Sequence, residues 1–261
     1  MHPSPGPRLY RPNRPDTPPA GTDADTAQHA ERNRLLRAIP PAEYAWLLAR
    51  LETVTFRNGE VLVGRDEVYS HVYFPQTCVV SQINRMNDGN TVEVGTIGNE
   101  GMVGLSVFLD AGATPSDTIV QVPGASHRVS AEIFLTGAHE RPELHRLLHR
   151  YTLAFLTQVA QTASCNRAHT LEERCARWLL MTHDRVGSDT FLLTHEFLSY
   201  MLGVRRSGVS VVAATFQKAG LIHYARGKIT VLDRQRLEGA SCQCYRVVQT
   251  HFDRLFSSAT A

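Results

Sequence analysis

LTHEFLSYMLGVRRSGVSVVAATFQKAGLI, residues 193–222, carries the strongest structural signal in this chain of 261 residues. Thr194 can cap a helix over residues 195–202, and Gly203 then supplies a turn that accepts a positive φ. A second helix over about residues 206–219 would bury one apolar face, which consists of Val209, Val212 and Phe216. Two short helices joined by a glycine turn, with a small residue where they cross, predict a helix-turn-helix.

The next segment, LIHYARGKITVLD over residues 221–233, predicts a β-hairpin wing with cations at its tip. Residues 166–236 hold eleven Lys and Arg against six Asp and Glu, a local charge of +5, whereas the whole chain has a formal charge of +2. A basic domain of this kind suits the phosphates of double-stranded DNA. A helical hairpin that packs against protein is the alternative. It is disfavoured by the wing, the charge and the polar face of the second helix, which holds Arg205, Arg206, Ser207, Ser210 and Gln217.

Short β-branched segments punctuated by glycine occupy residues 53–135, among them VTFRNGEVLV, TVEVGTIG and TIVQVPGASHRVS. Asn58-Gly59 and Asp88-Gly89 are dipeptides typical of tight turns. Such a run predicts a β-roll of the sandwich or jelly-roll type. With helical segments on both sides of it, the predicted fold class is α+β.

The segment from Pro142 to Asn166 carries apolar residues at steps of three and four, which predicts a helix of about 25 residues and roughly 37 Å. A β domain of this size cannot cover so long a helix. We therefore expect one apolar stripe to pack on the β-roll and another on a second copy of the chain. An ordinary core helix is the alternative. The predicted homodimer seam consists of Leu147, Tyr151, Ala154, Phe155 and Gln158.

These patterns divide the chain into five parts. Residues 1–30 contain seven of the 13 prolines and predict a disordered tail. We expect the β-roll over 31–140, the dimerisation helix over 141–166, the winged helix-turn-helix over 167–245 and a C-terminal extension over 246–261.

The order of β-roll, long helix and winged helix-turn-helix resembles the Crp/Fnr family of bacterial transcription regulators. The segments RYTLAFLTQVAQTASCNRAHTLEERCARWLL and LTHEFLSYMLGVRRSGVSVVAATFQKAGLI carry the likeness, which covers about residues 33–250. The resemblance implies a homodimer with a cyclic-nucleotide-binding-like sensor domain, a dimerisation helix and a DNA-reading C-terminal domain. It also implies an effector of unknown identity and makes RNA polymerase a candidate further partner.

The resemblance assigns roles within the second helix of the helix-turn-helix. Arg206 falls on the family's base-reading arginine, whose fork can take guanine O6 and N7 together. Ser207 and Val211 fall where a cAMP-binding member has a glutamate and a second arginine, so a different target site is expected. The full set of expected DNA contacts is Thr194, Arg205, Arg206, Ser207, Ser210 and Lys228.

Nucleotide-binding relatives hold cAMP with a glutamate on the ribose and an Arg-Ser pair on the phosphate. Here Leu105 stands at the place of the glutamate and Ser116-Asp117 at that of the pair, where an aspartate repels phosphate. We therefore expect no tight cAMP binding, although Glu100 is an alternative ribose contact. The candidate effector pocket consists of Glu100, Gly101, Gly104, Leu105, Ser116 and Asp117.

Other classes of function find little support. No apolar run of about 18 residues and no apolar signal region occur, so we expect a cytoplasmic protein without a membrane partner. Residues 1–77 lack the cysteines that iron–sulfur relatives use as ligands. Cys242-Gln243-Cys244 offers only two thiolates, and the alternatives for them are a structural or redox-reactive pair and an inert pair. The β-roll holds no close histidine cluster of the cupin enzymes. No catalytic residue, metal or cofactor is predicted, and a cyclic-nucleotide-responsive module without DNA binding remains the alternative function.

Overall fold

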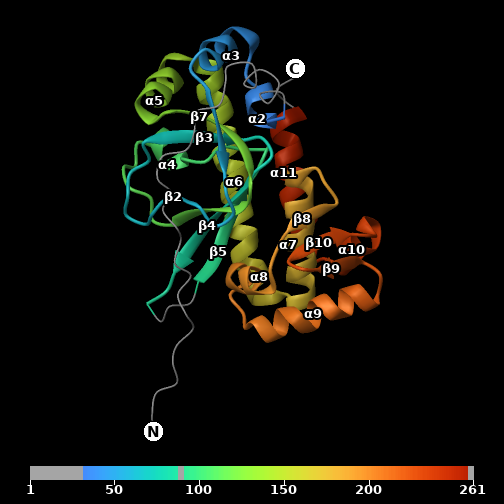
Figure 1. The fold of residues 1–261 in the computed structure, drawn as a ribbon. Helices are drawn as coiled ribbons and strands as arrows, with labels where there is room; N and C mark the ends of the chain where they lie inside the picture. Colours follow the sequence, from blue (N-terminus) through green and yellow to red (C-terminus); the bar gives the residue numbers. More distant parts are fainter. Residues whose placement is uncertain (1–31, 88–90, 258–261) are drawn as a thin grey trace.

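The computed structural model describes residues 32–87 and 91–257, so the predicted tail and the Asp88-Gly89 turn lie outside the described residues. Within them a β-roll, a long helix and a helical domain with a small sheet follow one another along the chain (Figure 1). The predicted α+β class is confirmed.

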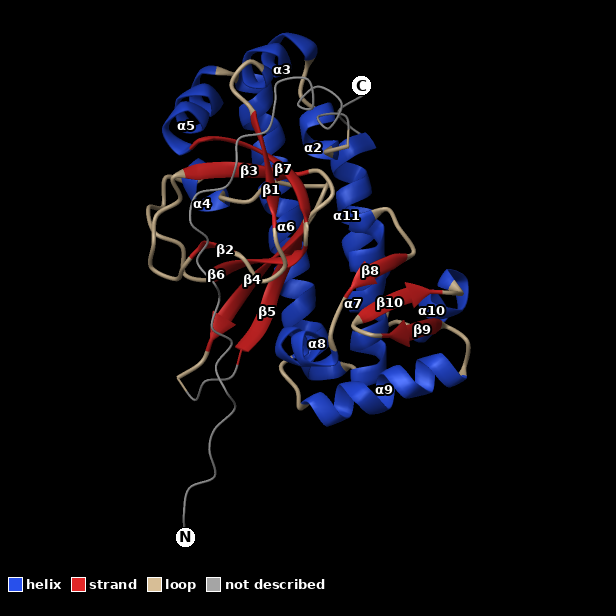
Figure 2. Cartoon of the chain, viewed as in Figure 1, coloured by secondary structure: helices blue, strands red, loops and turns tan. Residues whose placement is uncertain are grey.

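The β-roll consists of two antiparallel sheets with strand orders β1-β7-β3 and β2-β6-β4-β5 (Figure 2). β6 lies inside its sheet, and all six of its residues are buried. The strands are β1 (Glu52–Phe56), β2 (Val61–Val63), β3 (His71–Pro75), β4 (Val79–Arg85), β5 (Thr91–Ile97), β6 (Asp117–Val122) and β7 (Gly124–Ser130). The short helices around them are α2 (Arg34–Arg37), α3 (Pro41–Leu48), α4 (Leu105–Phe108) and α5 (Ala131–Glu140).

The long helix α6 (Pro142–Ala168) has 27 residues, begins with a proline and spans about 40 Å. It packs closely on the β-roll because glycine faces it: a Cβ on Gly95 would lie 2.7 Å from the ring of Phe155. The Tyr151 hydroxyl donates to the carbonyl of Met102 (2.9 Å) and accepts from its N–H (3.1 Å). Large side chains of α6 are thus fixed to the β-roll of the same chain.

The predicted dimer seam lies on the wrong face of α6. Its five residues are at most 6% exposed in the single chain, because they pack inside the chain against the β-roll and the last helix, residues 244–257. The large apolar side chains that α6 does expose are Leu153 and Leu156, at 64% and 56%. The homodimer itself stays a prediction, but Leu147, Tyr151, Ala154, Phe155 and Gln158 cannot form its interface.

The C-terminal domain begins with α7 (Leu171–Val186), where Thr170 and Glu173 form a capping box. β8 precedes two helices, β9 and β10 follow them, and the three strands form a sheet of order β8-β10-β9. The elements are β8 (Thr190–Leu192), α8 (His195–Leu202), α9 (Arg206–Lys218), β9 (Ile222–Ala225), β10 (Lys228–Val231) and α10 (Arg234–Ala240).

The last helix, α11 (Cys244–Ser257), runs along α6 and returns to the start of the β-roll (Figure 1). The Arg34 guanidinium pairs with Asp253 at 3.2 Å and lies 4.3 Å from the ring centroid of Phe256. Much of the predicted C-terminal extension is therefore an ordered helix that connects both domains. Of the helices described, none has the length and apolar character to cross a membrane.

Candidate nucleic-acid interface

The helix-turn-helix forms for local reasons. Thr194 Oγ1 accepts the N–H of Phe197 at 3.1 Å and caps α8, and Gly203 ends the helix at a φ of 63°. The buried Ser199 lets the two helices cross closely, because its side chain is small. α9 is anchored in the core by Val209, Val212, Ala213 and Phe216.

The other face of α9 meets solvent at one end of the molecule (Figure 2). Arg205, Arg206 and Ser207 are exposed on its first turn, and Val211 is 64% exposed one turn further on. Arg205 holds the N-cap position without a side-chain hydrogen bond to the helix. The N–H groups of the first turn and the positive end of the helix dipole can therefore meet an anion such as a phosphate.

Ser210 differs from the other predicted contacts, because it is half-buried. Its hydroxyl donates to the carbonyl of Arg206 at 3.1 Å and lies 3.0 Å from Nδ1 of His195. Gln217 is also engaged, since its Oε1 accepts the N–H of Tyr224 at 2.8 Å and ties α9 to the wing. Arg206 and Ser207 are thus the predicted polar residues most free to meet a base edge.

The sequence reasoning missed the contact of His195 with Tyr224. The two rings stack at a centroid distance of 4.1 Å, which joins α8 to the wing. Burial, and then the nearby Arg206 charge, lower the pKa of His195, because both disfavour the charged ring. His195 and Tyr224 are far apart in the sequence, so no local pattern predicts their contact.

The wing is a two-residue β-hairpin. Arg226 and Gly227 have φ values of 50° and 75°, as a type I′ turn requires, and Lys228 pairs with Ala225 across it. The Gly227 carbonyl accepts the N–H of Leu193 at 2.9 Å. This bond places exposed Lys228 beside the start of α8, so Thr194 and Lys228 belong to one surface.

A groove of ≈ 960 Å³ separates the start of α9 from the sensor domain. Met86 and Val92 line it from the β4–β5 side, and Tyr200, Arg205 and Arg206 line it from the helix-turn-helix. The arrangement of the two domains therefore sets the space in front of the N-terminal end of α9.

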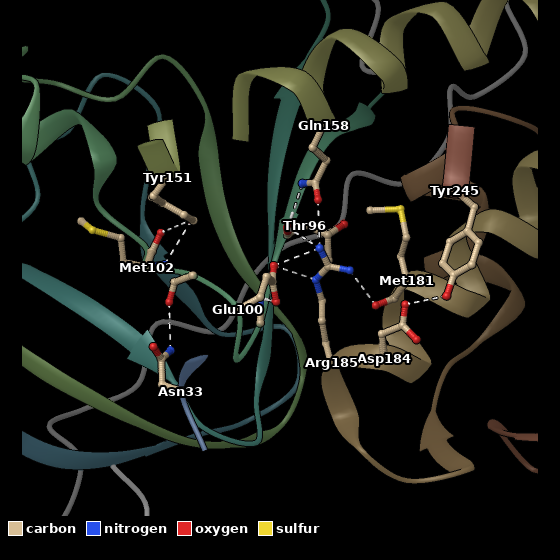
Figure 3. Close-up of polar contacts among 12 residues, drawn as sticks. Asn33, Thr96, Glu100, Met102, Tyr151, Gln158, Met181, Asp184, Arg185 and Tyr245 are labelled. Atoms are coloured by element: carbon tan, nitrogen blue, oxygen red, sulfur yellow. Dashed lines mark hydrogen bonds and ion pairs between the residues drawn. The ribbon is translucent and has the colours of Figure 1, made fainter. Parts of the chain in front are cut away.

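A buried ion pair couples the sensor domain to the C-terminal domain (Figure 3). Arg185 of α7 pairs with Glu100 at 2.9 Å, and the two side chains are 6% and 7% exposed. The Arg185 guanidinium also donates to Oε1 of Gln158 and to the carbonyl of Met181, at 2.9 and 2.7 Å. Gln158 in turn donates to the carbonyl of Thr96 at 2.8 Å, so α6, α7 and the β-roll meet in one network.

This network changes the interpretation of the candidate effector pocket. Glu100 is engaged by Arg185, so it is not free to bind a ribose as the alternative supposed. Asp117 pairs with Arg85 at 2.5 Å and Ser116 donates to Asn84 at 2.6 Å. Of the others, Leu105 is buried in α4, Gly104 caps that helix at a φ of 100°, and Gly101 packs against Tyr151.

A second buried group lies on the same domain boundary. Glu93 of β5 accepts hydrogen bonds from Ser81 (2.6 Å), Thr96 (2.7 Å) and Nε1 of Trp178 in α7 (3.1 Å). Burial raises the pKa of Glu93 above its usual 4.5, although these donors and the Arg177 charge oppose the shift. The folded protein therefore keeps this proton to a higher pH than the unfolded chain does.

This shift predicts a pH-dependent stability. As pH rises through 4.5 to the folded pKa of Glu93, the unfolded state loses its proton first and the free energy of unfolding falls. Glu93→Gln keeps a neutral group of the same shape, so its melting temperature should exceed that of the wild type at pH 8 and match it near pH 5. Thermal melts at both values test this, with the exposed Glu52→Gln as control. Parallel pH profiles for wild type and Glu93→Gln would contradict it.

Comparisons with known proteins show which proteins this chain resembles. Residues 173–240 match the Crp-like helix-turn-helix domain family. The chain is 24% identical over 216 residues to the CRP-like cAMP-activated global transcriptional regulator of Mycobacterium tuberculosis, covering 79% of this chain and 95% of that protein. FixK2 from Bradyrhizobium japonicum shares the fold with a TM-score of 0.64 and 19% identity, covering 74% of this chain and 98% of FixK2. The c-di-GMP-responsive regulator CLP of Xanthomonas campestris has a TM-score of 0.53 and 17% identity, covering 81% and 100% of the two chains.

Proposed function

We propose that this chain, a Crp/Fnr-type transcription regulator with a Crp-like helix-turn-helix domain, reads a specific sequence of double-stranded DNA as a homodimer. One observation carries the proposal: Arg206 is exposed on the first turn of α9, while the apolar side of that helix is occupied by the core. Helix-turn-helix domains insert this end of the second helix into the major groove. The Arg206 fork would then bind one guanine in each half-site.

The exposed stripe of α6 supports the homodimer. Leu153, Leu156, Ala160 and Ala163 are all exposed and follow one another at steps of three, four and three residues. This is the spacing of a two-stranded coiled coil, and the small alanines let two helices approach closely. Two copies of α6 packed along this stripe would bury the apolar surface that one chain leaves in water.

The contacts around Arg206 fall into two kinds. Ser207 is too short to compete with the arginine for discrimination, and exposed Val211 offers a methyl surface for thymine. Thr194, Arg205 and Lys228 lie where they would bind phosphates, which positions the protein without reading sequence. Ser210 supports the set by fixing His195 and the start of α9.

Lys228→Ala tests the phosphate role of the wing. Lys228 is exposed beside the turn, so its loss should leave the fold intact. We expect binding to weaken about equally for every duplex, and the slope of log affinity against log salt to become shallower by about one unit per half-site. Fluorescence anisotropy with labelled duplexes across a salt series measures both. An unchanged salt slope would remove Lys228 from the DNA surface, and no binding by the wild type would favour the module without DNA binding.

We also propose that the effector is not cAMP. The carboxylates of Glu100 and Asp117 are held by Arg185 and Arg85, so the candidate pocket presents no free cation to a cyclic phosphate. Calorimetry should show no micromolar binding of cAMP, and cAMP should not change DNA affinity. Micromolar binding together with tighter DNA binding would overturn this. The named relatives are cAMP-activated in one case and c-di-GMP-responsive in another, so the fold admits different effectors.

The remaining parts of the proposal follow from DNA regulation. The relatives are transcription regulators, and we assign this chain no catalytic role. It would act in the cytoplasm, where bacterial DNA lies, and RNA polymerase is the further partner that a transcription regulator would meet.

A further inference from the structure

Four potential metal ligands converge at the end of α6. Cys165 lies in its last turn and His169 is its C-cap residue, whereas Cys242 and Cys244 lie between α10 and α11 and at the start of α11. One ligand atom from each residue lies within 4.8 Å of every other. The two sulfurs of Cys165 and Cys242 are 3.4 Å apart, and Sγ of Cys244 is 3.7 Å from Nδ1 of His169.

These distances fit one tetrahedral ion. With Zn–S bonds of about 2.3 Å and a Zn–N bond of about 2.0 Å, neighbouring sulfurs lie about 3.8 Å apart, and a sulfur and a nitrogen about 3.5 Å. An iron–sulfur cluster shares its four ligands among two or four iron atoms, so the complete ligand set spreads farther apart than the ligands of a single ion. Three thiolates and an imidazole form a common set for structural zinc.

The surroundings have the charge that such a site needs. The three cysteines are at most 4% exposed and form a small buried cluster of their own. Arg174 and Arg177 lie within electrostatic range of Cys165, and among the described residues Nε of each is buried without a hydrogen-bond partner. A zinc ion with three thiolates and a neutral histidine carries one negative charge, which these two cations would offset.

We propose that Cys165, His169, Cys242 and Cys244 bind one Zn²⁺ ion. Cys165 and His169 precede α7 and Cys242 and Cys244 follow α10, so the ion ties the two ends of the winged domain together beside the end of α6. All four ligands come from the protein, as in a structural site that leaves no open position. The ion would hold α9 in a fixed orientation to the stripe through which two chains would pair.

Metal content tests this independently of DNA binding. Full-length protein, purified with reductant and without chelator, should contain about one zinc per chain by mass spectrometry of the elements. Replacement by Co²⁺ should give the thiolate-to-cobalt charge-transfer bands and strong visible bands of a tetrahedral site. Cys244→Ser and His169→Ala should lose most of the metal. Cys175→Ser changes another buried free cysteine, outside the cluster, and should keep it.

The wild-type measurements need no variant, so the proposal can fail even if the variants do not fold. Reduced wild type that neither contains zinc nor takes up Zn²⁺ or Co²⁺ would overturn it. Retention of the metal by folded Cys244→Ser would overturn it as well. A Cys165–Cys242 disulfide found by peptide mass spectrometry in metal-free, folded protein would assign the cluster to redox chemistry instead.

Discussion

Leu156→Glu is expected to convert the homodimer into a monomer and to weaken binding to a duplex with two half-sites by about 100-fold or more. Leu156 is 56% exposed in the single chain, so a charge there is solvated in the monomer and buried only at the seam. Losing the link between two DNA-binding domains removes the effective concentration that the first bound domain gives the second. Light scattering measures the mass, and anisotropy measures the affinity.

Leu109→Glu is the matched control, because Leu109 is 51% exposed and lies outside α6. It should leave the dimer and the DNA affinity unchanged. Phe155→Glu should behave differently from both: Phe155 is 6% exposed against the β-roll, so a charge there should unfold the chain. A dimeric Leu156→Glu protein with wild-type affinity would place the seam elsewhere.

Arg206→Ala is expected to weaken binding to the preferred site by about 1–3 kcal/mol for each half-site and to relax the preference at one G·C pair in each. The alanine removes a bidentate guanine contact, and the core keeps its packing because Arg206 is exposed. Binding to random duplex should fall much less. The affinities of wild type and variant for the preferred site and for a site with that pair exchanged form a cycle that isolates the contact.

Lys228→Ala serves as the control for this cycle, because it should lower affinity for both sites equally. Circular dichroism and light scattering should show that both variants keep their helices and their oligomeric state. If Arg206→Ala weakened specific and random duplexes by the same factor, Arg206 would be a phosphate contact. The reading role would then pass to Ser207.

The helix-turn-helix could be predicted because its signals are local. The cap at Thr194, the glycine turn and the apolar spacing of α9 all lie within 30 residues of sequence. The β-roll could be predicted from its glycine turns and from the alternating pattern of its strands. Where neighbouring residues specify an element, the sequence prediction and the structure agree.

The face of α6 could not be predicted in the same way. The helix carries two apolar stripes, and periodicity does not say which one meets the chain's own sheet. Tyr151 and Phe155 go inward because Gly101 and Gly95 make room for their rings, which only the tertiary structure shows. Leu153 and Leu156 are left outside.

Contacts between segments that are far apart in the sequence could not be predicted from it either. Arg185 and Glu100 come from different domains, and nothing near Glu100 in sequence reveals its partner. The cysteine–histidine cluster joins two pairs from opposite ends of the winged domain, and each pair alone offers only two ligands. Such sites depend on how the chain closes on itself.

Selection of bound sequences from a pool of random duplex DNA tests the central claim most directly. The purified wild type should enrich an inverted repeat whose half-sites are centred about 10 base pairs apart, with a G·C pair at the same place in each half. Selection with Arg206→Ala should enrich the same repeat without that pair. A wild-type pool that stays random after repeated rounds would contradict the account, because a dimer that reads sequence must enrich an inverted repeat.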